Sequence, residues 1–209
     1  DDPMNECWEF CFSSNYIVNT NIKYKKKYII SDLLAPKLIK TYVDKKIKRI
    51  ENQITLNKFL YVPNSYNSFR RYGYYRDIDD KIYIDWQKKI IKSNDNIFFK
   101  KHIKSRFDYN IFSKKIYING LMEEQLDKFD LFIFDVISQP FFSIAKTDKK
   151  ILYLDINQRI IDKKAYKLIK NRAYVFKCNY LTTTPNEINR AISMALKFKI
   201  KNFHILKYC

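Results

Sequence analysis

The chain has 209 residues and a formal net charge of +18, from 40 Lys and Arg residues against 22 Asp and Glu residues. This length suits one large domain, or one domain with a fragment of another. A hydrophobic fraction of 46% and an aromatic fraction of 17% exclude a disordered chain. No apolar run approaches the roughly 18 residues that a membrane-spanning helix needs.

The positive charge fits nucleic acid, a membrane surface or an anionic substrate as partner. The excess is nearly all Lys, however, and it is spread along the whole chain. Lys, Ile, Asn, Tyr and Phe are abundant together while Gly occurs only twice, which is the pattern of AT-rich codons. Genome bias therefore explains the Lys excess as well as a partner does. We do not expect nucleic acid to be the partner, because the aromatic residues mostly lie inside apolar runs.

Residues 1–57 lack an alternation of strands and helices. One helix is predicted there, over Ser31–Glu51, with Ser31 or Asp32 as its N-cap. We expect a helical or irregular connecting segment, or the remnant of an N-terminal domain, without a core of its own. Because the chain begins at Asp1 without Met, we also expect it to be a processed or trimmed piece of something longer.

From residue 58 to residue 209, short apolar runs alternate with helical patterns. The predicted strands are Phe59–Val62, Asn96–Lys100, Lys115–Ile118, Leu131–Phe134, Ile151–Leu154 and Tyr174–Lys177. The predicted helices are Ile82–Lys92, Met122–Lys128, Pro140–Ala145, Lys163–Lys170 and Pro185–Lys197, the last with a capping box. The runs are too continuous for strands with one solvated face, so they predict an α/β domain with a doubly wound, mostly parallel sheet.

Polar side chains follow three of these strands, and ligands of parallel sheets bind at the carboxyl ends of strands. The candidate ligand-binding residues are Asn64, Ser65, Lys100, His102, Asp135, Ser138 and Gln139. They suit a phosphate or a sugar hydroxyl, since they combine small polar groups, cations and the start of a helix near Pro140. For each group an ordinary interpretation stays open, as a plain turn, a solvated basic loop or a simple N-cap.

No metal site is predicted. Cys7 and Cys11 are four residues apart but have no second close pair, which a zinc site needs. Asp77-Ile78-Asp79 has the spelling of a metal-binding motif but lies in a basic loop rather than at a strand end. A metal-independent protein with reduced thiols is the expectation.

The order of these motifs resembles the C-terminal, nucleotide-sugar-binding half of GT-B-type bacterial glycosyltransferases that build capsule or lipopolysaccharide. Lys100 and His102 match that group's Lys-x-His-Pro motif, and Asp135 and Ser138 match its Asp-x-x-Ser-Thr motif. Ile103 replaces the group's Pro, Gln139 its Thr, and Ser143 a Glu that commonly holds the ribose of the nucleotide. The resemblance covers about residues 58–196 and implies a Rossmann-like domain.

The resemblance implies transfer of a sugar from a nucleotide-sugar, the donor substrate, to a bacterial surface glycan. The acceptor glycan could be lipid-linked, the location would be cytoplasmic, and a Lys-rich face would allow peripheral contact with the inner face of the membrane. No catalytic residue is assigned, since the catalytic base of the group usually comes from an N-terminal domain. Two alternatives stay open: a catalytically degenerate interaction domain on a Rossmann-like scaffold, and a basic nucleic-acid-binding module.

Overall fold

The computed structural model describes residues 16–18, 28–30, 57–64, 78–101, 122–145, 147–158, 161 and 163–200. The strands are β1 (Tyr16–Val18), β2 (Tyr28–Ile30), β3 (Phe59–Val62), β4 (Ile97–Phe99), β5 (Leu131–Phe134), β6 (Lys150–Asp155) and β7 (Tyr174–Lys177). The helices are α3 (Asp80–Lys92), α4 (Gln139–Ala145), α5 (Lys163–Arg172) and α6 (Pro185–Lys197), with a 3₁₀ helix, η4, at Glu123–Lys128.

Strands β3 to β7 form one sheet in the order β4-β3-β5-β6-β7, and every pair in it is parallel. The prediction of a doubly wound parallel sheet with flanking helices is confirmed. All four residues of β3 and of β5 are buried, which is why their sequences read as continuous apolar runs. The strand predicted at Lys115–Ile118 and the helix predicted at Ser31–Glu51 lie outside the described residues.

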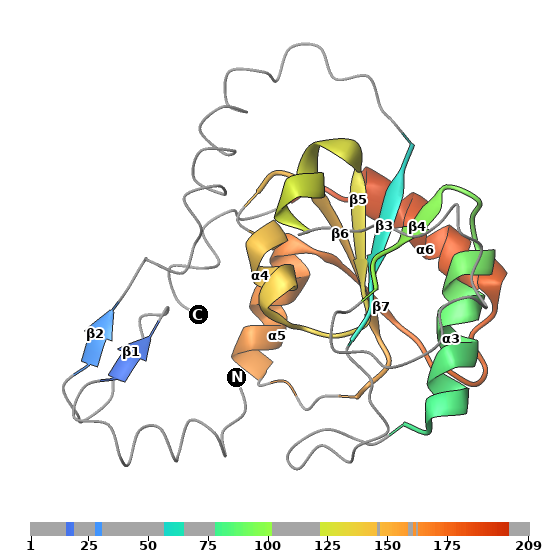
Figure 1. Ribbon diagram of the computed structural model, residues 1–209, viewed down its shortest axis with the longest axis horizontal. Helices are drawn as coiled ribbons and strands as arrows, with labels where there is room; N and C mark the ends of the chain where they lie inside the picture. Colours follow the sequence, from blue (N-terminus) through green and yellow to red (C-terminus); the bar gives the residue numbers. More distant parts are fainter. Residues whose placement is uncertain are drawn as a thin grey trace.

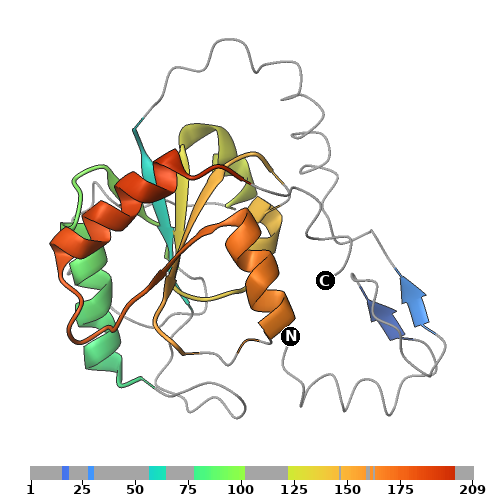
Figure 2. The same cartoon turned by 180° about the vertical axis from the view of Figure 1, so that it is seen from behind.

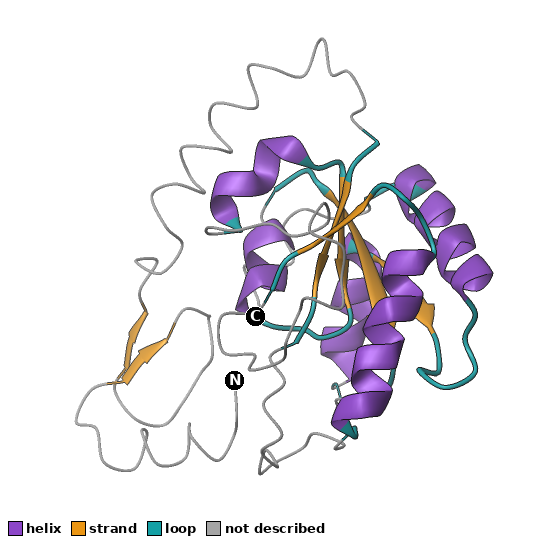
Figure 3. Cartoon of the chain, turned by 45° about the vertical axis from the view of Figure 1, so that its right-hand side comes forward, coloured by secondary structure: helices purple, strands orange, loops and turns teal. Residues whose placement is uncertain are grey.

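Helices cover both faces of the sheet (Figures 1 and 3), with α3 and α6 on one face and α4 and α5 on the other. The view from behind shows the same layers (Figure 2). Successive residues of each strand therefore pack into different cores. On β3, Phe59 and Tyr61 join the α3–α6 core, while Leu60 and Val62 join the core under α4 and α5.

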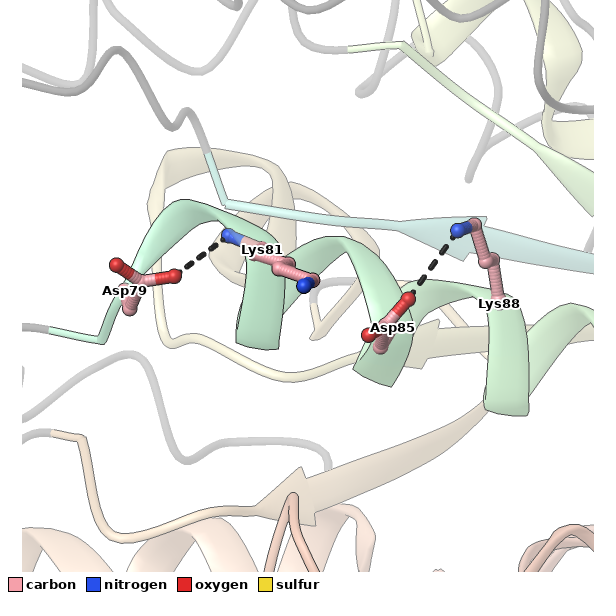
Figure 4. Close-up of polar contacts among 4 residues, drawn as sticks. All are labelled: Asp79, Lys81, Asp85 and Lys88. Atoms are coloured by element: carbon pink, nitrogen blue, oxygen red, sulfur yellow. Dashed lines mark hydrogen bonds and ion pairs between the residues drawn. The ribbon is translucent and has the colours of Figure 1, made fainter.

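Helix α3 begins with a cap that the sequence analysis had placed in a loop. The Asp79 carboxylate accepts a hydrogen bond from the Lys81 N–H at 2.9 Å (Figure 4). One turn on, Lys88 Nζ lies 3.1 Å from Asp85 Oδ1. Both partners of this ion pair are exposed, so it adds little to stability. Asp79 therefore caps α3, while Asp77 lies outside the described residues.

Helix α6 begins as predicted. The Thr184 hydroxyl accepts from the Glu187 N–H, and the Glu187 carboxylate accepts from the Thr184 N–H at 2.8 Å, which is a complete capping box. The buried side of the helix carries Ile188, Ala191, Ile192 and Ala195.

The short strands β1 and β2 were not predicted. They pair in parallel as a separate two-stranded sheet, with Tyr16 opposite Tyr28. Each is only three residues long, too short to show the alternation by which a strand is recognised.

A buried arginine joins three elements on the α4–α5 face. Arg172, the last residue of α5, is 1% exposed. Its guanidinium donates hydrogen bonds of 2.6 to 3.0 Å to the carbonyl groups of Ile144, Ala145, Thr147 and Lys149. These carbonyls lie at the end of α4 and in the turn into β6, and the Ile144 carbonyl also accepts from the Thr147 N–H and hydroxyl. Burial lowers the pKa of Arg172 to about 10, so the side chain stays charged at neutral pH.

We expect Arg172→Met to lower the free energy of unfolding by about 3 kcal/mol or more, because it leaves several buried carbonyl groups without a donor. Urea unfolding followed by circular dichroism measures this. The matched control is Arg190→Met, which changes an exposed residue of α6 and should shift stability by less than about 0.5 kcal/mol. Equal effects of the two substitutions would show that the Arg172 hydrogen bonds contribute no net stability.

Candidate functional site

The chain order of the strands creates one switch point in the sheet. From β3 the chain passes to β4 on one side, and it returns on the other side of β3 as β5. The connections therefore diverge between β3 and β5, and ligands of open parallel sheets bind at the carboxyl edge of such a point. This edge is the candidate functional site, and its described residues come from the ends of β3, β4 and β5.

The structure brings five predicted residues to this edge. Asn64 lies just beyond β3, Asp135 directly follows β5, and Ser138 directly precedes α4. Lys100 directly follows β4, and its N–H donates to the Tyr61 carbonyl of β3 at 2.9 Å. Gln139, whose backbone opens α4, belongs to the same edge.

The distance across the edge is larger than the sequence analysis required. A single cleft formed by Lys100 and Ser138 requires the strands that end near Lys100 and Val136 to be close neighbours. They are β4 and β5, and β3 lies between them. Two inter-strand spacings separate them by about 10 Å, so a ligand that contacts both strand ends must reach across β3. Ser65 and His102 lie outside the described residues, and their roles stay predictions.

The Asp135 side chain points into the protein. It is 1% exposed, and its Oδ2 accepts hydrogen bonds from the Tyr61 hydroxyl at 2.5 Å and the Tyr83 hydroxyl at 2.8 Å. The Tyr83 oxygen in turn accepts from the Asn64 backbone N–H at 3.0 Å. We call these four residues the Asp135 network. It joins β3, α3 and the end of β5 in one buried set of hydrogen bonds.

The Asp135 network changes what two predicted residues can do. The Asn64 N–H was expected to be free for a phosphate, but it is used inside the protein by Tyr83. The Asp135 carboxylate was expected at the surface of the site, but its burial keeps it from contact with a ligand in this conformation. Lys100 and Ser138 are partly exposed.

Burial dominates the electrostatics of the Asp135 network. Burial raises the pKa of Asp135. The hydrogen bonds donated by Tyr61 and Tyr83 oppose that rise, and so do two nearby groups, the Asn64 N–H and the Trp86 indole N–H. Burial also raises the pKa of both tyrosines far above the usual value, with the Asp135 charge as the next cause. Both hydroxyls therefore remain protonated and donate to the carboxyl group.

More polar groups of α3 lie beside the Asp135 network. Within the described part of the chain, Trp86 Nε1, both amide atoms of Gln87 and Asp135 Oδ1 are buried without a hydrogen-bonding partner. Trp86 lies near the carboxyl group and Gln87 near the Tyr83 hydroxyl, but outside hydrogen-bonding geometry. A buried polar atom without a partner costs about 1 to 3 kcal/mol. The fold thus accepts an energetic cost at this edge that a purely apolar core would avoid.

A second polar group lies at the same edge, at the ends of β6 and β7, and was not predicted. The Tyr166 hydroxyl of α5 donates to Asp155 Oδ2 at 2.7 Å, and the Asn157 N–H donates to Oδ1 at 3.1 Å. The ammonium groups of Lys170 and Lys177 lie 4.9 and 5.8 Å from the centre of the Tyr166 ring. Burial raises the pKa of Tyr166, which therefore stays a donor. This group holds α5 against the sheet.

Comparisons with known proteins add no assignment, since no protein-family model matches the chain and no curated protein does. Within the residues that the structure describes, no three His, Cys, Asp or Glu side chains are grouped as metal ligands would be. The candidate site is therefore defined by its geometry alone.

The raised pKa of Asp135 has a consequence for stability. The folded state keeps its proton to a higher pH than the unfolded state, whose carboxyl group titrates near about 3.9. The contribution of Asp135 to stability is thus complete below that pH and is lost as the pH rises through the folded pKa. Asp135→Asn removes the titration. We expect the free energy of unfolding of the wild type to fall relative to that of Asp135→Asn as the pH rises from about 4.

Urea unfolding of both proteins over a pH series measures this difference. The control is Asp127→Asn, which makes the same substitution at an exposed position. A wild type that gains stability over Asp135→Asn with rising pH would mean that the tyrosine hydrogen bonds outweigh burial.

Proposed function

We propose that this chain is the donor-binding half of a glycosyltransferase and binds a nucleotide-sugar at the carboxyl edge between β3 and β5. The observation that carries the proposal is the switch point. Four residues chosen from the sequence as ligand-binding candidates, Asn64, Lys100, Asp135 and Ser138, lie at that one edge of a Rossmann-like sheet. The resemblance of their motifs to those of polysaccharide glycosyltransferases suggests a nucleotide-sugar as the ligand.

Phosphate recognition is the chemistry that these side chains support. Lys100 at the end of β4, with Lys101 beside it and His102 next in the chain, would hold the phosphates through charge-assisted hydrogen bonds. The Ser138 hydroxyl, on the far side of β3, would take a second phosphate oxygen or a sugar hydroxyl. Because α4 has only seven residues, its dipole adds little, and the side chains carry the binding.

The same groups would assist the transfer itself. As the sugar leaves the nucleotide, negative charge develops on the departing phosphate. Lys100 directly follows β4, so its charge would be in place to stabilise that phosphate, and His102 would add a second donor. The catalytic base would come from outside residues 58–209, and no metal is required in this scheme because the cations supply the charge.

The proposed setting is the cytoplasmic side of a bacterial membrane, where a growing and possibly lipid-linked glycan would be the acceptor. None of the described helices is long and apolar enough to cross a bilayer. Exposed lysines such as Lys170 and Lys177 would allow contact with anionic lipid headgroups.

A second candidate is an interaction domain without nucleotide binding. It is favoured by one observation, the burial of the Asp135 carboxylate under Tyr61 and Tyr83. In the resembling enzymes this aspartate belongs to the motif of the donor site, and here its side chain is turned away from any ligand. A domain kept only for its fold would need the Asp135 network and nothing at Lys100 or Ser138.

Calorimetric titration of the full chain with UDP, CDP, CMP and GDP separates the two candidates. We expect one of these nucleotides to bind, and Lys100→Ala, His102→Ala and Ser138→Ala each to weaken it roughly tenfold, as the loss of one charge-assisted or buried hydrogen bond does. Lys100→Ala should also reduce the salt dependence of binding.

The matched control is Lys197→Ala. This residue is exposed in the last turn of α6, near the amino edge of the sheet, where Lys150 of β6 bonds to the Phe198 carbonyl. Its removal takes away the same charge and should leave affinity unchanged. Absence of nucleotide binding at millimolar concentration would remove the glycosyltransferase proposal and leave the interaction domain.

A further inference from the structure

We infer that Tyr83 and Asp135 are positioning residues for the donor site, which act by holding the turn at the end of β3 and do not touch the ligand. The inference rests on the proposed function for its ligand. Its structural basis is the path from the Asn64 N–H to the Tyr83 oxygen and from the Tyr83 hydroxyl to Asp135 Oδ2.

Backbone hydrogen-bond donors are scarce directly after β3. The parallel pairing of β3 with β5 ends at Val62, opposite Phe134. The next residue, Pro63, has no N–H to donate. The Asn64 N–H is therefore the first backbone donor beyond the strand, and it is directed inward to Tyr83 at 3.0 Å. This hydrogen bond ties the backbone just beyond β3 to α3.

Asp135 determines which way the Tyr83 hydroxyl points. A tyrosine hydroxyl has one proton, and here the proton is donated to Asp135 Oδ2 at 2.8 Å. Its lone pairs are then available to the Asn64 N–H, and donation to a carboxylate makes the oxygen a stronger acceptor. Without the carboxyl oxygen, the hydroxyl could rotate and lose its contact with the turn. The two residues therefore work as a pair.

Tyr61 provides an internal comparison. Its hydroxyl donates to the same Oδ2, and both tyrosines are fully buried. The Tyr61 hydroxyl lies beside the Tyr83 hydroxyl as well as Asp135, but the Asn64 N–H donates to Tyr83. Tyr61→Phe and Tyr83→Phe thus remove equivalent hydrogen bonds to one carboxyl oxygen, and only Tyr83→Phe releases the β3 turn.

The position of the β3 turn gives it an effect on ligand affinity. Asn64 is the described residue of the candidate site that lies between Lys100 and Ser138, since β3 separates the strands that carry them. A ligand that reaches from one to the other must pass over the β3 turn. If the turn is fixed beforehand, binding does not have to order it, and affinity is higher.

Two measurements on the full chain test the inference in Tyr83→Phe and Tyr61→Phe. The first is hydrogen exchange of the Asn64 amide by NMR, which needs no ligand. After correction for the change in global stability, we expect Tyr83→Phe to speed this exchange roughly tenfold and Tyr61→Phe to leave it unchanged, because only one variant removes the acceptor of the amide. Equal exchange in the two variants overturns the inference.

The second measurement is nucleotide affinity by calorimetry, at a temperature where both variants are fully folded. We expect the Kd to rise roughly tenfold in Tyr83→Phe and less than about twofold in Tyr61→Phe. An unchanged Kd in Tyr83→Phe, together with faster Asn64 exchange, overturns the positioning role while the proposed function stands. A wild type that binds no nucleotide overturns the proposed function, and Asn64 exchange alone then decides whether Tyr83 holds the turn.

Discussion

The burial of one carboxyl group at the carboxyl edge of the sheet constrains most of the described domain. Asp135 follows the most deeply buried strand, and its position on the α3 side of the sheet leaves it no route to solvent. A buried carboxyl group needs donors, and the fold supplies two tyrosine hydroxyls, one from β3 and one from α3. These two hydrogen bonds fix the distance of α3 from the sheet and the end of β3 relative to β5.

At the amino edge of the sheet, a buried positive charge, that of Arg172, joins the elements. Arg172 ends α5 just before β7 begins, and it binds carbonyl groups where α4 ends and β6 begins. A carboxyl group surrounded by donors thus fastens the carboxyl edge on the α3 side, and a guanidinium surrounded by acceptors fastens the amino edge on the α5 side. Each is removed from water and each is satisfied mainly by the protein, so the loss of partners costs more than an exposed ion pair could contribute.

The sheet and its helices were predictable because their signals are local. The apolar run Leu131–Phe134 and the capping box of Thr184 and Glu187 each occupy a few consecutive residues, and the structure has both as expected. The direction of the Asp135 side chain was not predictable, because its partners lie 74 and 52 residues away in the sequence. A weaker signal was present, since a tyrosine inside an apolar run, such as Tyr61, needs a buried partner for its hydroxyl.

The division between buried and exposed polar residues determines which observations bear on function. The Asp135 network joins β3, α3 and the end of β5 whether or not a ligand binds at the edge. It removes the Asp135 carboxyl group from contact with a ligand, but it is compatible with both an enzyme and an interaction domain. Lys100 and Ser138 bear more directly on function, because both are partly exposed. Ligand binding at this edge therefore depends on Lys100 and Ser138, while the Asp135 network determines how rigidly the strand ends are held.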